Sequence, residues 1–203
     1  MKKLEELYWI ITTTHELRKD RGGYVSASSL FDGAISSLKL LAGENPVLLG
    51  GFAIGYYTDP RATSDFDLTL IPDNLKQAFT KLLGAGFSSS GTNDYKGVNI
   101  HHFQKNGFKL DILEFTNKKF QQEVVSRAKP NDFSGEKISI ISPEDLIVTK
   151  LLSNRPKDKI DILSLLETGG LELDLIRVKE ATQDLKIFDR YSFIEDSLPD
   201  FRR

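Results

Sequence analysis

The dipeptide Asn106-Gly107 constrains the fold of this chain more than any other feature of its sequence. It separates two segments rich in apolar residues, 98–104 and 108–115. An Asn-Gly pair between two such segments is the strongest short-range signal for a two-residue β-hairpin turn, because both residues tolerate a positive φ angle. We therefore predict an antiparallel strand pair over these residues.

The hairpin fixes which side chains face one another across the strand pair. A two-residue turn pairs Lys105 with Phe108, which places His102 opposite Asp111 on the same face of the sheet. A slip of one residue would place His101 there instead. His102 is then a candidate accessory residue that contacts Asp111 or an acceptor, and an ordinary structural histidine is the alternative.

Helical and extended patterns alternate along the rest of the chain. Apolar residues at helical spacing predict helices over residues 4–17, 26–41, 52–57, 75–84, 117–128, 143–153, 157–168 and 172–190. Short apolar runs predict further strands over residues 47–49, 66–71 and 137–141. Strands and helices are thus mixed in the centre of the chain, and its two ends are helical.

This order of elements predicts an α+β fold with an α/β core, in which a small mixed β-sheet is flanked by N-terminal helices and a C-terminal helical bundle. The N-terminal helical segment covers residues 1–43, the α/β core residues 44–142 and the helical bundle residues 143–195. We expect residues 196–203 to form a frayed tail.

Charge and composition exclude several classes of protein. The 203 residues carry 27 Lys and Arg against 29 Asp and Glu, a net charge of -2, which argues against binding nucleic acid through bulk positive charge. The chain has no Cys, which excludes a disulfide framework, a thiolate metal site and a cysteine nucleophile. The apolar run at residues 7–11 is too short for a signal sequence or a membrane span, so we expect a cytoplasmic protein with no membrane partner.

Three carboxylates lie in the predicted sheet. Asp65 and Asp67 are two residues apart at the start of a strand, so both project to the same face, about 7 Å apart. Asp111 is the lone acid of the stretch 108–113, and a buried carboxylate needs a cationic partner or a metal ion. A surface strand and a salt-bridged core edge are the alternatives for each acid by itself, whereas the set of three indicates a metal site.

Gly50 and Gly51 lie where a short apolar strand turns into a helix. Without Cβ atoms the backbone can approach a ligand closely, and a helix N-terminus presents free N–H groups to an anion. A plain tight turn is the alternative. A phosphate-binding turn about 15 residues before an acidic pair is typical of a site in which Mg²⁺ bridges carboxylates and a polyphosphate.

Three segments carry a resemblance to a known family. They are Leu48–Gly51, Asp65–Leu68 after 13 intervening residues, and Lys109–Leu113 around Asp111. This pattern resembles the signature of the polymerase-β-type nucleotidyltransferase superfamily. Within the superfamily, the chain is similar to stand-alone bacterial enzymes of the AbiEii toxin type in segments 61–64, 143–147 and 155–158, and at Lys150 and Asp161. The resemblance covers residues 44–168.

The resemblance implies transfer of a nucleoside monophosphate from a nucleoside triphosphate (NTP) to an acceptor hydroxyl, with pyrophosphate leaving. It assigns catalysis and the binding of two Mg²⁺ ions to Asp65, Asp67 and Asp111, and makes Asp111 a candidate general base. Nucleotide and phosphate binding would fall to Gly50, Gly51, Arg61, Ser64, Lys150 and Asp158. A solvated loop arginine at position 61 and a solvated helix face around Asp158 are the alternatives.

The resemblance leaves the acceptor open. Similar enzymes modify tRNA as toxins of toxin–antitoxin pairs, modify proteins, or adenylylate aminoglycoside antibiotics. The candidate partners are therefore an RNA, protein or small-molecule acceptor and an antitoxin protein. An RNA acceptor would need a basic patch, whose candidates are Lys118, Lys119, Arg127, Lys129, Arg155, Lys157 and Lys159.

Two functions without catalysis are the alternatives. One is a nucleotide-binding or interaction module on the same fold, and the other is a purely structural metal site. Three converging carboxylates argue against an unliganded module, because they repel one another unless a cation lies between them.

Overall fold

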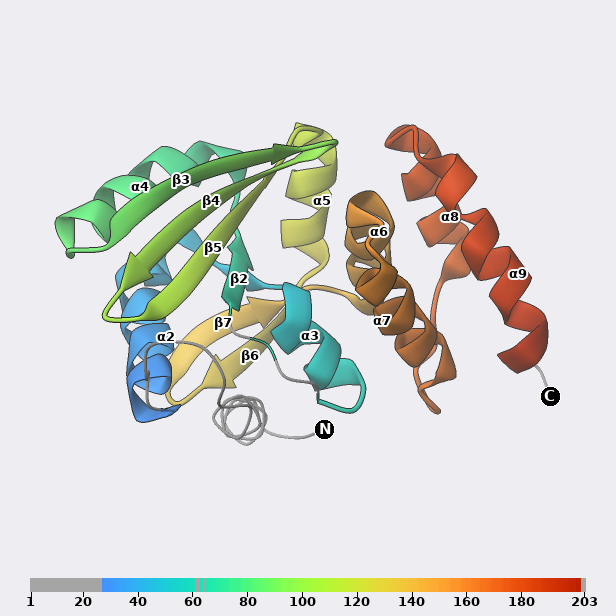
Figure 1. The fold of residues 1–203 in the computed structure, drawn as a ribbon, viewed down its shortest axis with the longest axis horizontal. Helices are drawn as coiled ribbons and strands as arrows, with labels where there is room; N and C mark the ends of the chain where they lie inside the picture. The colour runs from blue at the N-terminus through green and yellow to red at the C-terminus, as the bar shows by residue number, and fades with distance from the viewer. Residues whose placement is uncertain (1–26, 61–62, 64, 202–203) are drawn as a thin grey trace.

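The computed structural model describes residues 27–60, 63 and 65–201, so the predicted helix over residues 4–17 lies outside the described part of the chain. Within that part, one seven-stranded sheet has the order β3-β4-β5-β2-β1-β7-β6 (Figure 1). The strands are β1 (Val47–Leu48), β2 (Asp65–Thr69), β3 (Ser88–Tyr95), β4 (Val98–Lys105), β5 (Phe108–Phe115), β6 (Lys129–Phe133) and β7 (Glu136–Ile140). The pairs β2–β5 and β1–β7 are parallel and the other pairs are antiparallel.

Helices surround this sheet, as the predicted α+β class requires, and that class is confirmed. The α-helices are α2 (Ala27–Leu41), α3 (Gly50–Tyr57), α4 (Leu75–Gly84), α5 (Lys118–Arg127), α6 (Pro143–Ser153), α7 (Pro156–Glu167), α8 (Leu175–Asp184) and α9 (Ser192–Phe201). Single 3-10 turns are η1 (Ala42–Glu44), η2 (Pro72–Asn74) and η3 (Phe188–Arg190). No helix among residues 27–60 and 65–201 is long and apolar enough to cross a membrane.

The β4–β5 hairpin forms at the predicted turn. Asn106 and Gly107 both have positive φ angles, 50° and 81°, as a two-residue turn that matches the strand twist requires. His102 pairs with Asp111 in the resulting ladder, which confirms the predicted register. The turn chemistry alone therefore places this histidine beside this carboxylate.

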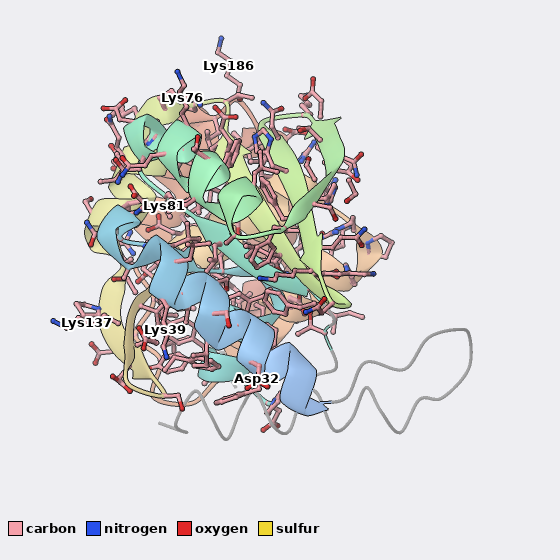
Figure 2. The ribbon with its side chains drawn as sticks, turned by 90° about the vertical axis from the view of Figure 1, so that its left-hand side faces the viewer. Asp32, Lys39, Lys76, Lys81, Lys137 and Lys186 are labelled. Atoms are coloured by element: carbon pink, nitrogen blue, oxygen red, sulfur yellow. The ribbon has the colours of Figure 1, made fainter. Side chains whose placement is uncertain are left out.

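Helices α2 and α4 lie side by side over one face of the sheet (Figure 2). A Cβ atom on Gly33 would lie 2.3 Å from Cγ of Phe108, so the absence of a side chain lets α2 pack directly on this ring. On α4, the ring centroid of Phe79 lies 5.3 Å from that of Phe103. The labelled Lys39 is exposed on the outer side of this layer (Figure 2).

Helix α6 links the sheet to the C-terminal helices and contacts α3, α7 and α8 (Figure 1). All of its residues are buried except Thr149 and Ser153, which are partly buried. It begins at the predicted Ser-Pro start, where the Ser142 hydroxyl accepts a hydrogen bond from the Asp145 amide at 3.2 Å. This buried helix fixes the position of the C-terminal helices against the sheet.

Two strands and one break differ from the sequence-based expectation. The edge strands β3 and β6 were not predicted, because β3 is polar and exposed along its whole length and β6 contains Pro130. The helix predicted over 172–190 is present but shorter, since α8 covers Leu175–Asp184 and Lys186 adopts a positive φ of 57°. Helix α9 also continues to Phe201, through most of the tail that was expected to fray.

Candidate functional site

A cavity of about 400 Å³ lies between the sheet, the N-terminus of α3 and the helices α6 and α7. Its volume is in the range of sites for small molecules and cofactors. Its lining residues are Leu49, Gly50, Gly51, Thr63, Asp65, Asp67, Tyr95, Lys96, Val98, Ile100, Asp111, Leu113, Phe115, Thr149, Lys150, Leu152, Ser153, Arg155, Lys157 and Arg190. The predicted glycines and all three predicted acids therefore face one cavity.

The register of the parallel strands β2 and β5 brings the acids together. Asp67 lies directly beside Asp111, and Asp65 lies beside Lys109. Neighbouring strands are about 4.8 Å apart, so the carboxylates of Asp67 and Asp111 share one face at close range. Sequence analysis placed each acid on a strand, but it did not specify this pairing.

The electrostatics of Asp67 reflect this crowding. Burial, together with the charges of Asp111 and Asp65, raises the pKa of Asp67 from 3.8 to about 7. The charge of Lys150 and a hydrogen bond from the Gly51 amide act in the opposite direction. Burial and the two neighbouring acids therefore disfavour the charged form of Asp67 more than Lys150 and the Gly51 amide favour it.

The turn at Gly50 and Gly51 is shaped by the same carboxylate. Gly50 has a φ of +66°, and a Cβ atom there would lie 1.8 Å from Oδ2 of Asp67. A Cβ atom on Gly51 would lie 2.7 Å from Oγ1 of Thr63. Glycine is thus required twice, because α3 begins in contact with the acidic strand.

His102 links Asp111 to the edge of the sheet. Nδ1 of His102 lies 2.8 Å from Oδ1 of Asp111, and Nε2 lies 2.9 Å from Nδ2 of Asn93. Burial raises the pKa of Asp111, and the hydrogen bond and charge of His102 oppose that effect. The predicted contact between His102 and Asp111 is present, and Asn93 extends it to β3.

Lys150 lines the cavity, whereas the predicted Asp158 is buried behind it in an ion network and is not part of the lining. Nζ of Lys150 is 2.7 Å from Asp161 and 3.5 Å from Asp158. Burial would raise the pKa of Asp158, but hydrogen bonds from Arg155 and Ser153 and the charge of Lys150 lower it to about 2. These contacts connect α6 to α7, so both residues have a structural role whether or not they touch a nucleotide.

Several residues of the cavity wall were not predicted as site residues, among them Tyr95, Lys96 and Arg190. Tyr95 is the last residue of β3, Lys96 begins the β3–β4 turn, and Arg190 comes from η3. The Arg190 guanidinium donates hydrogen bonds to the carbonyl oxygens of Leu151 and Leu152 at the end of α6. No local motif marks these positions, although Gly97 after Lys96 is a turn signal.

Two predicted phosphate-binding residues, Arg61 and Ser64, lie outside the described residues. Among residues 27–60, 63 and 65–201, no three Asp, Glu or His side chains form a compact group that could hold a metal ion. The donor chemistry nevertheless fits Mg²⁺, which prefers carboxylate oxygens, and burial together with the charges of Asp111 and Asp65 raises the pKa of Asp67, as expected for a carboxylate group that a cation would stabilise. The predicted pair of ions stays a prediction.

A second cavity, of about 550 Å³, lies beside the start of α6. Both of its arginines already have carboxylate partners, because Arg127 donates two hydrogen bonds to Asp145 and Arg177 pairs with Glu144. The carboxylate-lined cavity is therefore the candidate functional site.

A family model described as "Nucleotidyltransferase of unknown function (DUF6036)" matches residues 30–193. The chain belongs to this nucleotidyltransferase family. The match includes every described residue of the candidate site, so the resemblance to nucleotidyltransferases is confirmed at the level of the family. The narrower resemblance to AbiEii-type toxins stays a prediction. No curated protein matches the sequence.

Several solved structures are similar to this family member. A nucleotidyltransferase-like antigen of Paracoccidioides brasiliensis is 20% identical, with 84% of this chain and 94% of that chain covered and a TM-score of 0.45. The antibiotic-resistance factor ANT(2'')-Ia is 13% identical, with 86% and 97% covered and a TM-score of 0.47. A putative nucleotidyltransferase of Thermotoga maritima is 13% identical, with 78% and 91% covered and a TM-score of 0.44. These likenesses assign no substrate to the present chain.

Proposed function

We propose that this protein is a Mg²⁺-dependent nucleotidyltransferase that moves a nucleoside monophosphate from an NTP to an acceptor hydroxyl. The observation that supports this most is the position of Asp67 beside Asp111, next to the positive-φ turn at Gly50. A set of carboxylates beside a glycine-opened helix N-terminus suits a triphosphate and its cation.

The reaction forms one bond and breaks one. The oxygen of the acceptor hydroxyl bonds to the α-phosphorus, the bond from that phosphorus to the bridging α–β oxygen breaks, and pyrophosphate leaves with that electron pair. The hydroxyl proton goes to a base, for which Asp111 is the candidate. His102 holds this carboxylate in place by a hydrogen bond. The N-terminus of α3, where the Gly51 amide already donates to Asp67, would present its remaining N–H groups to the phosphates.

Asp65, Asp67 and Asp111 are the side chains that would hold Mg²⁺. When bound, the ion neutralises phosphate charge and lowers the pKa of the acceptor hydroxyl. On the opposite wall of the cavity, Lys150 and Arg155 lie near Asp67 and add positive charge. The leaving pyrophosphate would meet these cations.

Acidic side chains of the protein itself neutralise part of the positive charge of the predicted RNA-binding patch. Lys118 pairs with Glu114, and Arg127 pairs with Asp145. Acceptor assays should therefore include a small polyhydroxylated molecule and a protein as well as RNA.

Thermal unfolding with Mg²⁺ and each of the four NTPs tests the nucleotide site. At an NTP concentration of about 100 times its Kd, one NTP should raise the midpoint temperature of unfolding of the wild-type protein by roughly 5–11 °C. Asp67→Asn should abolish this shift, and the exposed control Asp73→Asn should retain it. An NTP labelled at the α-phosphate then tests transfer to each acceptor class.

The alternatives give different results. Stabilisation by Mg²⁺ without a further effect of any NTP would indicate a structural metal site. An NTP shift without label transfer to any acceptor would indicate a nucleotide-binding module. Absence of both shifts would contradict the proposed function.

A further inference from the structure

One wall of the carboxylate cavity is apolar and carries a half-exposed aromatic ring. Tyr95 is 51% exposed although it lines the cavity. Tyr95 pairs with the cavity-lining Val98. Two further lining residues, Ile100 and Leu113, pair across the β4–β5 ladder, and both side chains are partly buried. Leu113 is two residues from Asp111 and shares its face. The apolar wall is therefore continuous with the acidic one.

The turn that carries Tyr95 is held in place. Gly97 has a φ of +94°, and a Cβ atom on it would lie 2.7 Å from Cδ1 of Leu152, so the turn packs closely against the end of α6. The Thr116 amide donates a hydrogen bond to the Gly97 carbonyl oxygen at 3.1 Å. The ring of Tyr95 is thus presented to the cavity by a turn with fixed contacts on both sides.

Cations also line the cavity. Lys96 and Lys157 line it without an ion pair to any residue that the structure describes, and Arg155 lies near both Tyr95 and Asp67. A ligand that fits these walls has a planar, largely apolar part and a polyanionic part. An NTP has both, because its base has two aromatic faces and its triphosphate carries several negative charges.

We propose that the base of the NTP stacks on Tyr95 while the triphosphate extends to the Gly50–Gly51 turn. This proposal rests on the proposed function and adds the residue that holds the base. The half-exposed ring becomes covered when the nucleotide binds. Because every base has an aromatic face, the contribution of the ring applies to all four NTPs.

Calorimetric titration with Mg²⁺ and the α,β-methylene analogues of the four NTPs tests this proposal. Inorganic tripolyphosphate is the probe without a base. Tyr95→Ala should weaken binding of the nucleotide analogues by roughly 5- to 150-fold, because stacking on an aromatic side chain contributes that much per base. Its affinity for tripolyphosphate should stay within about twofold of wild type, since the ring contacts no phosphate.

Two further variants keep the test specific. Tyr95→Phe retains the aromatic face and should bind the analogues like wild type. Leu83→Ala removes a similarly exposed apolar side chain, 52% against 51%, from a helix outside the cavity lining and should also bind like wild type. If Tyr95→Ala does not fold, Tyr95→Leu supplies apolar bulk without an aromatic face and should show the same loss.

The outcomes separate this proposal from the function on which it rests. Unchanged binding of the analogues by Tyr95→Ala overturns the stacking role while the nucleotide site stands. An equal loss for the analogues and for tripolyphosphate overturns it as well, because the ring then acts on the phosphates or on the structure of the site. If wild type binds no analogue, the proposal falls together with the proposed function.

Discussion

His102 lies opposite Asp111 across the β4–β5 ladder, with Nδ1 of the imidazole 2.8 Å from Oδ1 of the carboxylate. An ionised carboxylate can only accept a hydrogen bond, so Nδ1 carries the proton. In a neutral ring Nε2 then accepts a hydrogen bond from the side-chain amide of Asn93. The three residues form a chain of hydrogen bonds from the sheet edge to the candidate base.

We expect His102→Ala to lower kcat for nucleotidyl transfer by about 10- to 100-fold, the usual cost of losing a partner that orients a ligand carboxylate. KM for the NTP should change less than kcat. Because the His102 hydrogen bond lowers the pKa of Asp111, its loss should move the acidic limb of the pH–rate profile to higher pH. His101→Ala is the matched control, since His101 pairs with Glu114 at 3.0 Å and contacts Phe79 of α4, away from the cavity.

Asp67→Asn should change how stability depends on pH. The folded chain holds a proton on Asp67 between its unfolded pKa of 3.8 and its folded value of about 7, where the unfolded chain has lost it. Stability should therefore fall as pH rises through this window, by up to about 4 kcal/mol. Chemical denaturation of Mg²⁺-free protein at pH 5 and pH 8 measures this. Asp67→Asn should lack the fall and exceed wild type in stability at pH 8; the same pH slope in both proteins would contradict this assignment.

Lys150→Met should destabilise the protein by about 3–5 kcal/mol, because it leaves Asp158 and Asp161 buried without their common cation. Lys157→Met is the control. Lys157 is an exposed lysine on α7, and its loss should change the free energy of unfolding by less than about 0.5 kcal/mol. Equal effects of the two substitutions on urea denaturation would show that Lys150 has no structural role.

Gly50→Ala should abolish Mg²⁺-dependent NTP binding and destabilise the fold. The new methyl group would overlap Oδ2 of Asp67, at 1.8 Å, in addition to the cost of a left-handed conformation. Gly135→Ala separates the two effects, because Gly135 has a φ of +85° and an added Cβ atom would meet nothing within 4 Å. The control should cost about 1–2 kcal/mol and leave binding unchanged. Thermal unfolding with and without NTP compares the two variants.

The features that could be predicted from the sequence are those that residues close together in the chain determine. The turn at Asn106-Gly107 fixed the register that brings His102 to Asp111, and the Ser142-Pro143 start of α6 was predicted correctly. The spacing of Asp65 and Asp67 predicted their common face. Each of these features depends on residues that are close in sequence.

The remaining features depend on contacts between distant segments. Strand β3 has no alternating pattern and forms because β4 offers it a ladder, so its residue Tyr95 could not be placed in the cavity. The pairing of Asp67 with Asp111 depends on the register of two strands 44 residues apart. Asp158 was predicted as a nucleotide contact from its family context, but its burial within the Lys150 network could not be seen from the sequence.

The hydrogen bonds from Arg190 to the end of α6 have a consequence for synthesis of the chain. The cavity walls run from Leu49 to Arg190, so a nascent chain acquires its carboxylates early and the last part of its cavity wall only when η3 has left the ribosome. A partly made chain would therefore hold the acids without the complete pocket. Nucleotide should stabilise the finished protein and have little effect on ribosome-bound intermediates that lack the C-terminal helices.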